Sequence, residues 1–135
     1  MNTIVEPERW KLDLEAAWRQ IPKAFRSEPT IRRTLQCHMY GYLNRKGCKV
    51  VADYLPPRIQ DRSIELIALG TEHDILCAIC FDVVVTLAAV KSLSSFEAAH
   101  KIIFTTGMLE KKVQESRFFL KPEIQHVHLQ PFHKE

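Results

Sequence analysis

The sequence predicts an α/β protein in which two helices precede a small mixed β-sheet. Apolar residues recur at helical spacing near the start, short valine- and isoleucine-rich runs follow, and strand-like and helix-like patterns then alternate. The chain has 135 residues, 46% hydrophobic and 26% charged, which fits one globular domain. We expect a single domain over residues 1–135, with an N-terminal helix region (1–26), a core (27–130) and a tail (131–135).

The first two elements are predicted to be helices. Residues 8–21 form the first helix, and Pro22 ends it. Ser27 is a suitable N-cap for the second helix, with Pro29 in its first turn and Gly47 as a terminator. The apolar positions are Trp10, Leu14, Ala17, Trp18 and Ile21 in the first helix and Ile31, Leu35, Met39, Tyr42 and Leu43 in the second.

Three strands are predicted next, over residues 48–55, 63–69 and 75–85. Pro56 and Pro57 close the first of them. The third is almost entirely apolar, which favours the centre of the sheet.

The remainder alternates between helix and strand. Helices are predicted over residues 86–100 and 109–119, and strands over 101–105 and 124–129. Such strand–helix–strand units imply parallel pairing with right-handed crossovers. The element order is therefore ααβββαβαβ, and we expect Phe118 and Phe119 to anchor the last helix to the core.

Four segments carry a resemblance to a known superfamily: RKGCKVVADY, SIELIALG, DILCAICFD and AAHKIIFTTGMLEKKVQES. With the element order, they resemble the restriction-endonuclease-like, or PD-(D/E)XK, superfamily over about residues 28–130, and the last is similar to its Mrr-type members. The closing pattern also resembles the N-terminal jaw domain of a small subunit of archaeal and eukaryotic RNA polymerase, which shares the fold without nuclease activity. The resemblance implies a three-layer α/β/α core with a mixed central sheet.

Carried onto this chain, the motif of the superfamily is degenerate. Such nucleases use two acids to hold a divalent cation and a lysine to position the attacking water. Glu65 takes the place of the first acid, but Ala78 and Cys80 take those of the second acid and the lysine. Mg²⁺ requires oxygen ligands, which neither residue supplies. Our first hypothesis is therefore a non-catalytic binding or assembly module that contacts nucleic acid or a protein and needs no cofactor.

Two other hypotheses stay open. In an active, metal-dependent DNA endonuclease with a migrated site, Glu65 and Asp53 would hold Mg²⁺, and Glu28, Lys91 and Glu97 would supply the missing groups. In a structural protein, an apolar edge strand over 124–129 would pair two copies into a homodimer.

A net charge of +3 permits DNA or RNA as a partner without requiring it. The candidate phosphate contacts are Arg26, Arg32, Arg33, Lys111 and Lys112. The alternative is that these residues are ordinary solvated helix surface, and no aromatic residues are interleaved with them for base stacking. The start of the chain lacks a signal pattern and no apolar run approaches a membrane span, so we expect a cytoplasmic protein that does not contact membranes.

The four cysteines raise the question of a zinc site. Cys77 and Cys80 form a CxxC pair, and Cys37 and Cys48 complete the count. Residues three apart on a strand point to opposite faces, which disfavours shared zinc or redox chemistry. We expect buried, inert thiols.

Two histidines raise a similar question. His126 and His128 share one face of the last predicted strand, with Glu123 and His133 nearby in the sequence. A transition-metal site is one interpretation. The polar face of an edge strand followed by a loose tail is the favoured one.

Overall fold

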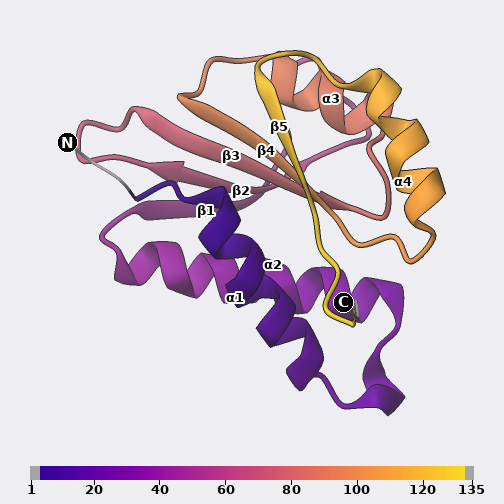
Figure 1. The fold of residues 1–135 in the computed structure, drawn as a ribbon. Coiled ribbons are helices and arrows are strands. Elements are labelled where there is room, and N and C mark those ends of the chain that lie inside the picture. The colour runs from indigo at the N-terminus through magenta and orange to yellow at the C-terminus, as the bar shows by residue number, and fades with distance from the viewer. Residues whose placement is uncertain (1–3, 133–135) are drawn as a thin grey trace.

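The computed structural model describes residues 4–132, and it confirms an α/β fold with a mixed central sheet (Figure 1). The helices are α1 (Pro7–Gln20), α2 (Glu28–Arg45), α3 (Leu87–Ser94) and α4 (Glu110–Ser116), and the strands are β1 (Lys49–Tyr54), β2 (Ile64–Leu69), β3 (Ile75–Asp82), β4 (His100–Thr105) and β5 (Ile124–His128). Short 3₁₀ turns at Lys23–Phe25 and Arg117–Phe119 follow α1 and α4. None of these helices combines the length and the apolar character needed to cross a bilayer.

The five strands of the described sheet lie side by side in chain order. β1, β2 and β3 pair antiparallel, whereas β3, β4 and β5 pair parallel. One row of paired residues crosses the whole sheet through Val51, Ile67, Ala78, Lys101 and Ile124. The predicted central position of β3 is therefore confirmed.

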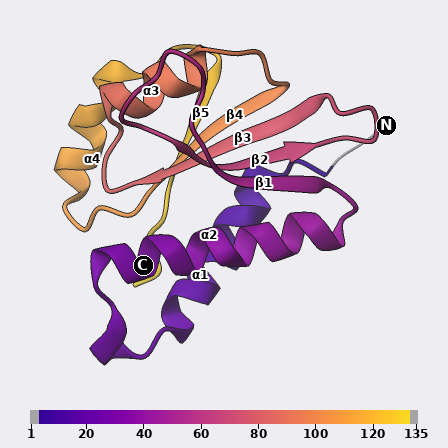
Figure 2. The ribbon, with the colours of Figure 1, turned by 180° about the vertical axis from the view of Figure 1, so that it is seen from behind.

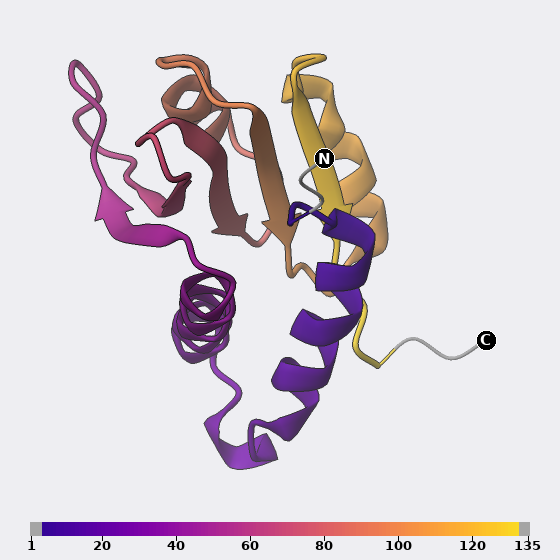
Figure 3. The ribbon, with the colours of Figure 1, turned by 90° about the vertical axis from the view of Figure 1, so that its left-hand side faces the viewer.

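Helices cover both faces of the sheet, as the end-on view shows (Figure 3). Successive residues of β3 point to opposite faces of the sheet. Cys77, Ile79 and Phe81 pack in the core under α1 and α2. Ala78 and Cys80 pack in the core under α3. Figure 2 shows α2 beneath β1 and β2, while α1 reaches across to β5.

The first two helices begin and end where the sequence predicts. The Ser27 hydroxyl accepts a hydrogen bond from the Thr30 backbone N–H, at 3.4 Å, so its predicted capping role is confirmed. α1 stops at Gln20, two residues before Pro22.

The third helix is shorter than predicted, because it ends at Ser94 instead of His100. The Ser95 hydroxyl donates to the Ser92 carbonyl at 2.7 Å, and the Ala99 N–H bonds to Ile75 O at 3.0 Å. Serine side chains compete with the helical hydrogen-bond ladder. The chain therefore leaves the helix early and returns to the sheet.

The prediction that two phenylalanines anchor α4 is wrong. Phe118 is 87% exposed and Phe119 is 41% exposed. Val113, which is fully buried, anchors this helix instead.

The segment after β5 packs against α1. The Glu15 carboxylate accepts the Gln130 N–H at 2.7 Å, and Arg19 donates to the Pro131 carbonyl at 2.9 Å. The Phe132 ring meets Trp18 edge-on, with centroids 6.1 Å apart. Residues 131–132, expected as part of a tail, thus belong to the packed structure.

The two outer strands differ in what they expose. β5 is an edge strand of the described sheet, and its apolar residues Ile124 and Val127 are buried in the cores. In β1, Val51 and Tyr54 are exposed and line an apolar hollow with Phe96.

Candidate functional site

Three adjoining hollows follow the edge of the sheet at which the parallel strands β3, β4 and β5 end, and we call them together the carboxyl-edge groove. Their volumes are about 550, 310 and 210 Å³. Glu28 lines the first and second, whereas Gly107, Met108 and Phe132 line the second and third. Open α/β sheets bind ligands at the carboxyl ends of their strands, so this groove is the candidate site.

Two acids and two arginines form a network at the first hollow. The Arg62 guanidinium lies 3.2 Å from the Glu65 carboxylate and 2.9 Å from the Asp82 carboxylate. Arg32 contacts the same two acids, at 3.1 and 3.4 Å. Each carboxylate is therefore shared between two cations.

The same network joins the ends of β2 and β3. Regular pairing of these strands stops at Leu66 and Ile79, and the Glu65 carboxylate accepts the Phe81 N–H at 3.1 Å. Arg62 also donates to the Phe81 carbonyl at 3.2 Å. Side chains thus replace the missing backbone hydrogen bonds between the two strands.

Burial makes this network electrostatically strong. Glu65 and Asp82 are each only 8% exposed. Burial alone lowers the pKa of Arg62, but the nearby acidic groups of Cys80, Glu65 and Asp82 raise the pKa above its ordinary value. Arg62 is a fixed cation between two carboxylates.

Asp53 lines the same hollow from β1. Its backbone φ is +54°, and regular pairing of β1 with β2 is interrupted at Asp53, between the Ala52–Leu66 and Tyr54–Ile64 pairs. Gln36 donates to the Asp53 carboxylate at 2.8 Å and to the Glu65 carbonyl at 2.9 Å. The Asp53 side chain therefore contacts α2 through Gln36.

The nuclease hypothesis named candidates that the structure brings together only in part. Glu65, Asp53 and Glu28 line one hollow. Lys91 and Glu97 do not line it, because Lys91 is exposed on α3, on the opposite face of the sheet from α2, and Glu97 is exposed after that helix. Ala78 and Cys80 are fully buried beneath α3.

Sequence reasoning missed Asp82 and Arg62. A signal existed for Asp82, because it is the one charged residue in the otherwise apolar strand Ile75–Asp82. Arg62 precedes β2 in an irregular segment, and its role depends on the separation of β2 and β3, which the sequence does not display.

The five basic candidates are in different situations. Arg26 donates to the Ile21 and Arg19 carbonyls at 2.8 and 3.0 Å, and it lies over the Phe132 ring at 4.7 Å. Arg32 belongs to the acid network described above. Arg33 is exposed, 3.8 Å from Asp53, and Lys111 and Lys112 are exposed on α4. Among the described residues, only Lys111 and Lys112 of the five make no ion pair and no side-chain hydrogen bond.

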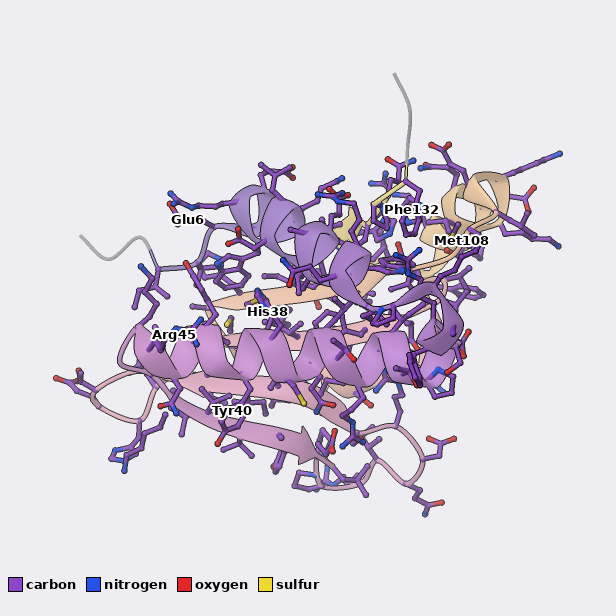
Figure 4. The ribbon with its side chains drawn as sticks, turned by 90° about the horizontal axis from the view of Figure 1, so that it is seen from below. Glu6, His38, Tyr40, Arg45, Met108 and Phe132 are labelled. Carbon is purple, nitrogen blue, oxygen red and sulfur yellow. The ribbon has the colours of Figure 1, made fainter. Side chains whose placement is uncertain are left out.

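The second hollow is largely apolar. Trp18, Ile31, Val83, Met108 and Phe132 contribute its apolar walls. Met108 and Phe132 lie side by side at the end of the molecule away from Glu6 (Figure 4). Trp18 is 2% exposed, and within residues 4–132 its indole Nε1 has no hydrogen-bond acceptor.

Gly107 lines the second and third hollows at a position that has no room for a side chain. A Cβ on Gly107 would lie 2.7 Å from the Val83 carbonyl oxygen and 2.9 Å from Val113 Cγ2. The Gly107 N–H bonds to that same carbonyl at 2.8 Å. Close approach of the two chain segments therefore requires glycine here.

The paired histidines adjoin the third hollow. The buried Thr105 hydroxyl lies 2.8 Å from His126 Nε2 and 2.8 Å from His128 Nδ1. Burial, with Arg117 and His128, lowers the pKa of His126 to about 4, and burial also lowers the pKa of His128. His133 lies outside the described residues, and among residues 4–132 no group of three His, Cys, Asp or Glu side chains is arranged to hold a metal ion.

The cysteines are free thiols in the described chain. Cys77 and Cys80 lie in different cores, as expected for residues three apart on a strand. Burial raises the pKa of Cys77 to about 12 and also raises the pKa of Cys80. Cys37 is exposed, so the expectation of buried cysteines is wrong for this one residue.

Comparisons of the chain with protein-family models, with curated proteins and with solved structures found no match.

Proposed function

We propose that this chain is a non-catalytic binding or assembly module with a restriction-endonuclease-like fold, and that the carboxyl-edge groove is its binding site. One observation carries the proposal: the carboxylates of Glu65 and Asp82 are both engaged by Arg62 and Arg32. A nuclease needs such carboxylates free to hold a divalent cation beside the phosphate. Here the guanidinium groups of Arg62 and Arg32 neutralise the two carboxylates in place of a divalent cation.

The composition of β3 supports the same proposal. The superfamily motif would place an acid and a lysine at Ala78 and Cys80, and both side chains are buried against α3. The carboxyl-edge groove is long, lined by both charged and apolar residues, and suited to recognition of an extended ligand.

An active metal-dependent endonuclease is the second candidate. The observation in its favour is that Glu65, Asp53 and Glu28 line one hollow. For Mg²⁺ to bind there, Arg62 would have to leave two buried carboxylates, which is costly because separated buried charges lose their mutual stabilisation.

Supercoiled plasmid incubated with the protein and either Mg²⁺ or Mn²⁺ tests the proposal. We expect no cleavage by the wild-type protein or by Glu65→Gln, whose folding is checked by circular dichroism. Metal-dependent cleavage that disappears in a folded Glu65→Gln variant would overturn the binding-module proposal and favour the nuclease.

A further inference from the structure

We infer that the carboxyl-edge groove binds an extended, basic polypeptide segment that also carries a bulky apolar side chain. This inference rests on the proposed binding function and names the partner of the same site.

The length of the groove suits an extended chain. It runs from Asp53 on β1 to His128 on β5 and so passes the ends of all five described strands. At about 4.8 Å between neighbouring strands, the four intervals span roughly 19 Å, which about six residues of extended polypeptide would cover.

The charge left free in the groove is acidic. Glu28, Asp61 and Glu110 line successive parts of it, and among the described residues none of them has an ion-pair partner. The arginines of the groove are engaged within the protein: Arg26 with backbone carbonyls, Arg32 and Arg62 with Glu65 and Asp82, and Arg33 with Asp53. Free carboxylates attract lysine or arginine and repel phosphate.

The middle of the groove carries the second, independent observation. Trp18 is almost completely buried in its wall, yet its indole N–H has no acceptor in the described chain. Buried donors are normally paired, and a peptide carbonyl is a suitable acceptor. Beside Trp18, Met108 is 72% exposed, so apolar surface is available for a bulky side chain.

Phe132 covers the position that the partner would take. Its ring packs edge-on against Trp18 and under the Arg26 guanidinium. Because the indole Nε1 has almost no accessible surface, a ligand carbonyl reaches it only when a neighbouring side chain such as this ring moves. Phe132 therefore acts as a movable cover, and Phe132→Ala should not weaken binding.

The test is fluorescence anisotropy with labelled hexapeptide pools in which lysine alternates with leucine, phenylalanine or methionine. Matched pools with glutamate in place of lysine, and a labelled oligothymidine, serve as probes of opposite charge. We expect the lysine pools to bind and both acidic probes to bind at least tenfold more weakly.

Two charge variants locate the site. Glu28→Gln combined with Asp61→Asn and Glu110→Gln should weaken binding of the lysine pools about tenfold, because three exposed ion pairs of modest strength are lost together. The control combines Glu72→Gln, Glu97→Gln and Glu123→Gln, three exposed acids outside the groove, and should bind as the wild type does.

The NMR chemical shift of the Trp18 indole N–H provides a second measurement. A purely electrostatic attraction at the groove surface would leave this chemical shift unchanged. Peptide binding should shift this signal downfield, while the Trp10 indole signal, identified with Trp10→Phe, should stay in place. Equal binding by the two charge variants, no binding of the lysine pools, or preference for oligothymidine would overturn the inference. If one of these results is obtained and the plasmid assay shows no metal-dependent cleavage, only the inference of a basic peptide is wrong. Metal-dependent cleavage would instead contradict the binding-module proposal itself.

Discussion

Arg62 is the residue on which the charged end of the groove depends. It is held by Glu65, by Asp82 and by the Phe81 carbonyl, and its side chain is 13% exposed. Such an arrangement adds little net stability, because desolvation offsets much of the attraction. Removal of one partner is nevertheless expensive, since the others stay buried without compensation.

Replacement of Arg62 by alanine should lower the free energy of unfolding by about 3 kcal/mol, because two buried carboxylates lose a shared cation. Urea denaturation measures the change. The matched control is Arg33→Ala, which removes an arginine that is 69% exposed and 3.8 Å from Asp53, and should cost less than about 1 kcal/mol. Equal losses in the two variants would contradict this account of the network.

His126 should make stability sensitive to acid. Its pKa is lowered from 6.5 to about 4 in the folded protein, mainly by burial, so the unfolded chain takes up a proton first as the pH falls. Stability is then fully present above pH 6.5 and decreases toward pH 4. The decrease amounts to about 1 to 2 kcal/mol after allowance for solvent screening of a partly exposed ring. His128, whose pKa is also lowered, adds to the same trend.

Chemical denaturation between pH 7 and pH 4 measures this effect, and His126→Gln is the comparison. The variant should be less stable at pH 7, because it loses the ring's contact with Thr105, but its stability should decline less with acid. Parallel pH profiles for the two proteins would rule out His126 as the source.

At the level of elements, two glycines have opposite roles. Gly107 allows the chain after β4 to approach Val83 closely, whereas Gly41 lies inside α2, where a Cβ would meet only the flexible end of Arg45 at 3.1 Å. Gly107→Ala should destabilise the protein by roughly 2 kcal/mol through steric overlap with backbone. Gly41→Ala should stabilise it by about 0.5 to 1 kcal/mol through helix propensity. Thermal denaturation of both variants checks the opposite signs.

Most elements could be predicted from the sequence, because their signals are local. The Ser27 cap, the break at Pro22 and the apolar run of β3 depend on neighbouring residues and fall where they were expected. The early end of α3 was missed because apolar periodicity continues through Phe96, although the serines beside it favour a different backbone path.

The site was only partly predictable, for a physical reason. Glu65, Asp53 and Glu28 were named from the sequence and do line one hollow. The chemistry of Glu65 is determined by Arg62 and Asp82. These residues join Glu65 in one network where the ends of β2 and β3 no longer pair. Such tertiary geometry leaves no periodic signal in the sequence. The exposure of Phe118 and Phe119 is missed for the same reason, since aromatic residues are expected in a core.

The whole molecule presents its thiols unequally, which gives a direct measure of global unfolding. Cys37 is exposed, whereas Cys48, Cys77 and Cys80 are buried. A maleimide should therefore modify one thiol rapidly in the native protein, and the other three only as the molecule unfolds. Mass spectrometry over time counts the modifications. Rapid labelling of more than one thiol under native conditions would contradict the burial of the other three cysteines.

The contact between α1 and the segment after β5 has a consequence for biosynthesis. Glu15, Arg19 and Trp18 lie in the first element of the chain, and their partners Gln130, Pro131 and Phe132 follow the last strand. On the ribosome, α1 emerges first and can pair with α2, but it waits for nearly the entire chain before these contacts form. The second hollow of the groove, with Trp18 and Phe132 in its walls, thus forms only after the segment that follows β5 has been synthesised.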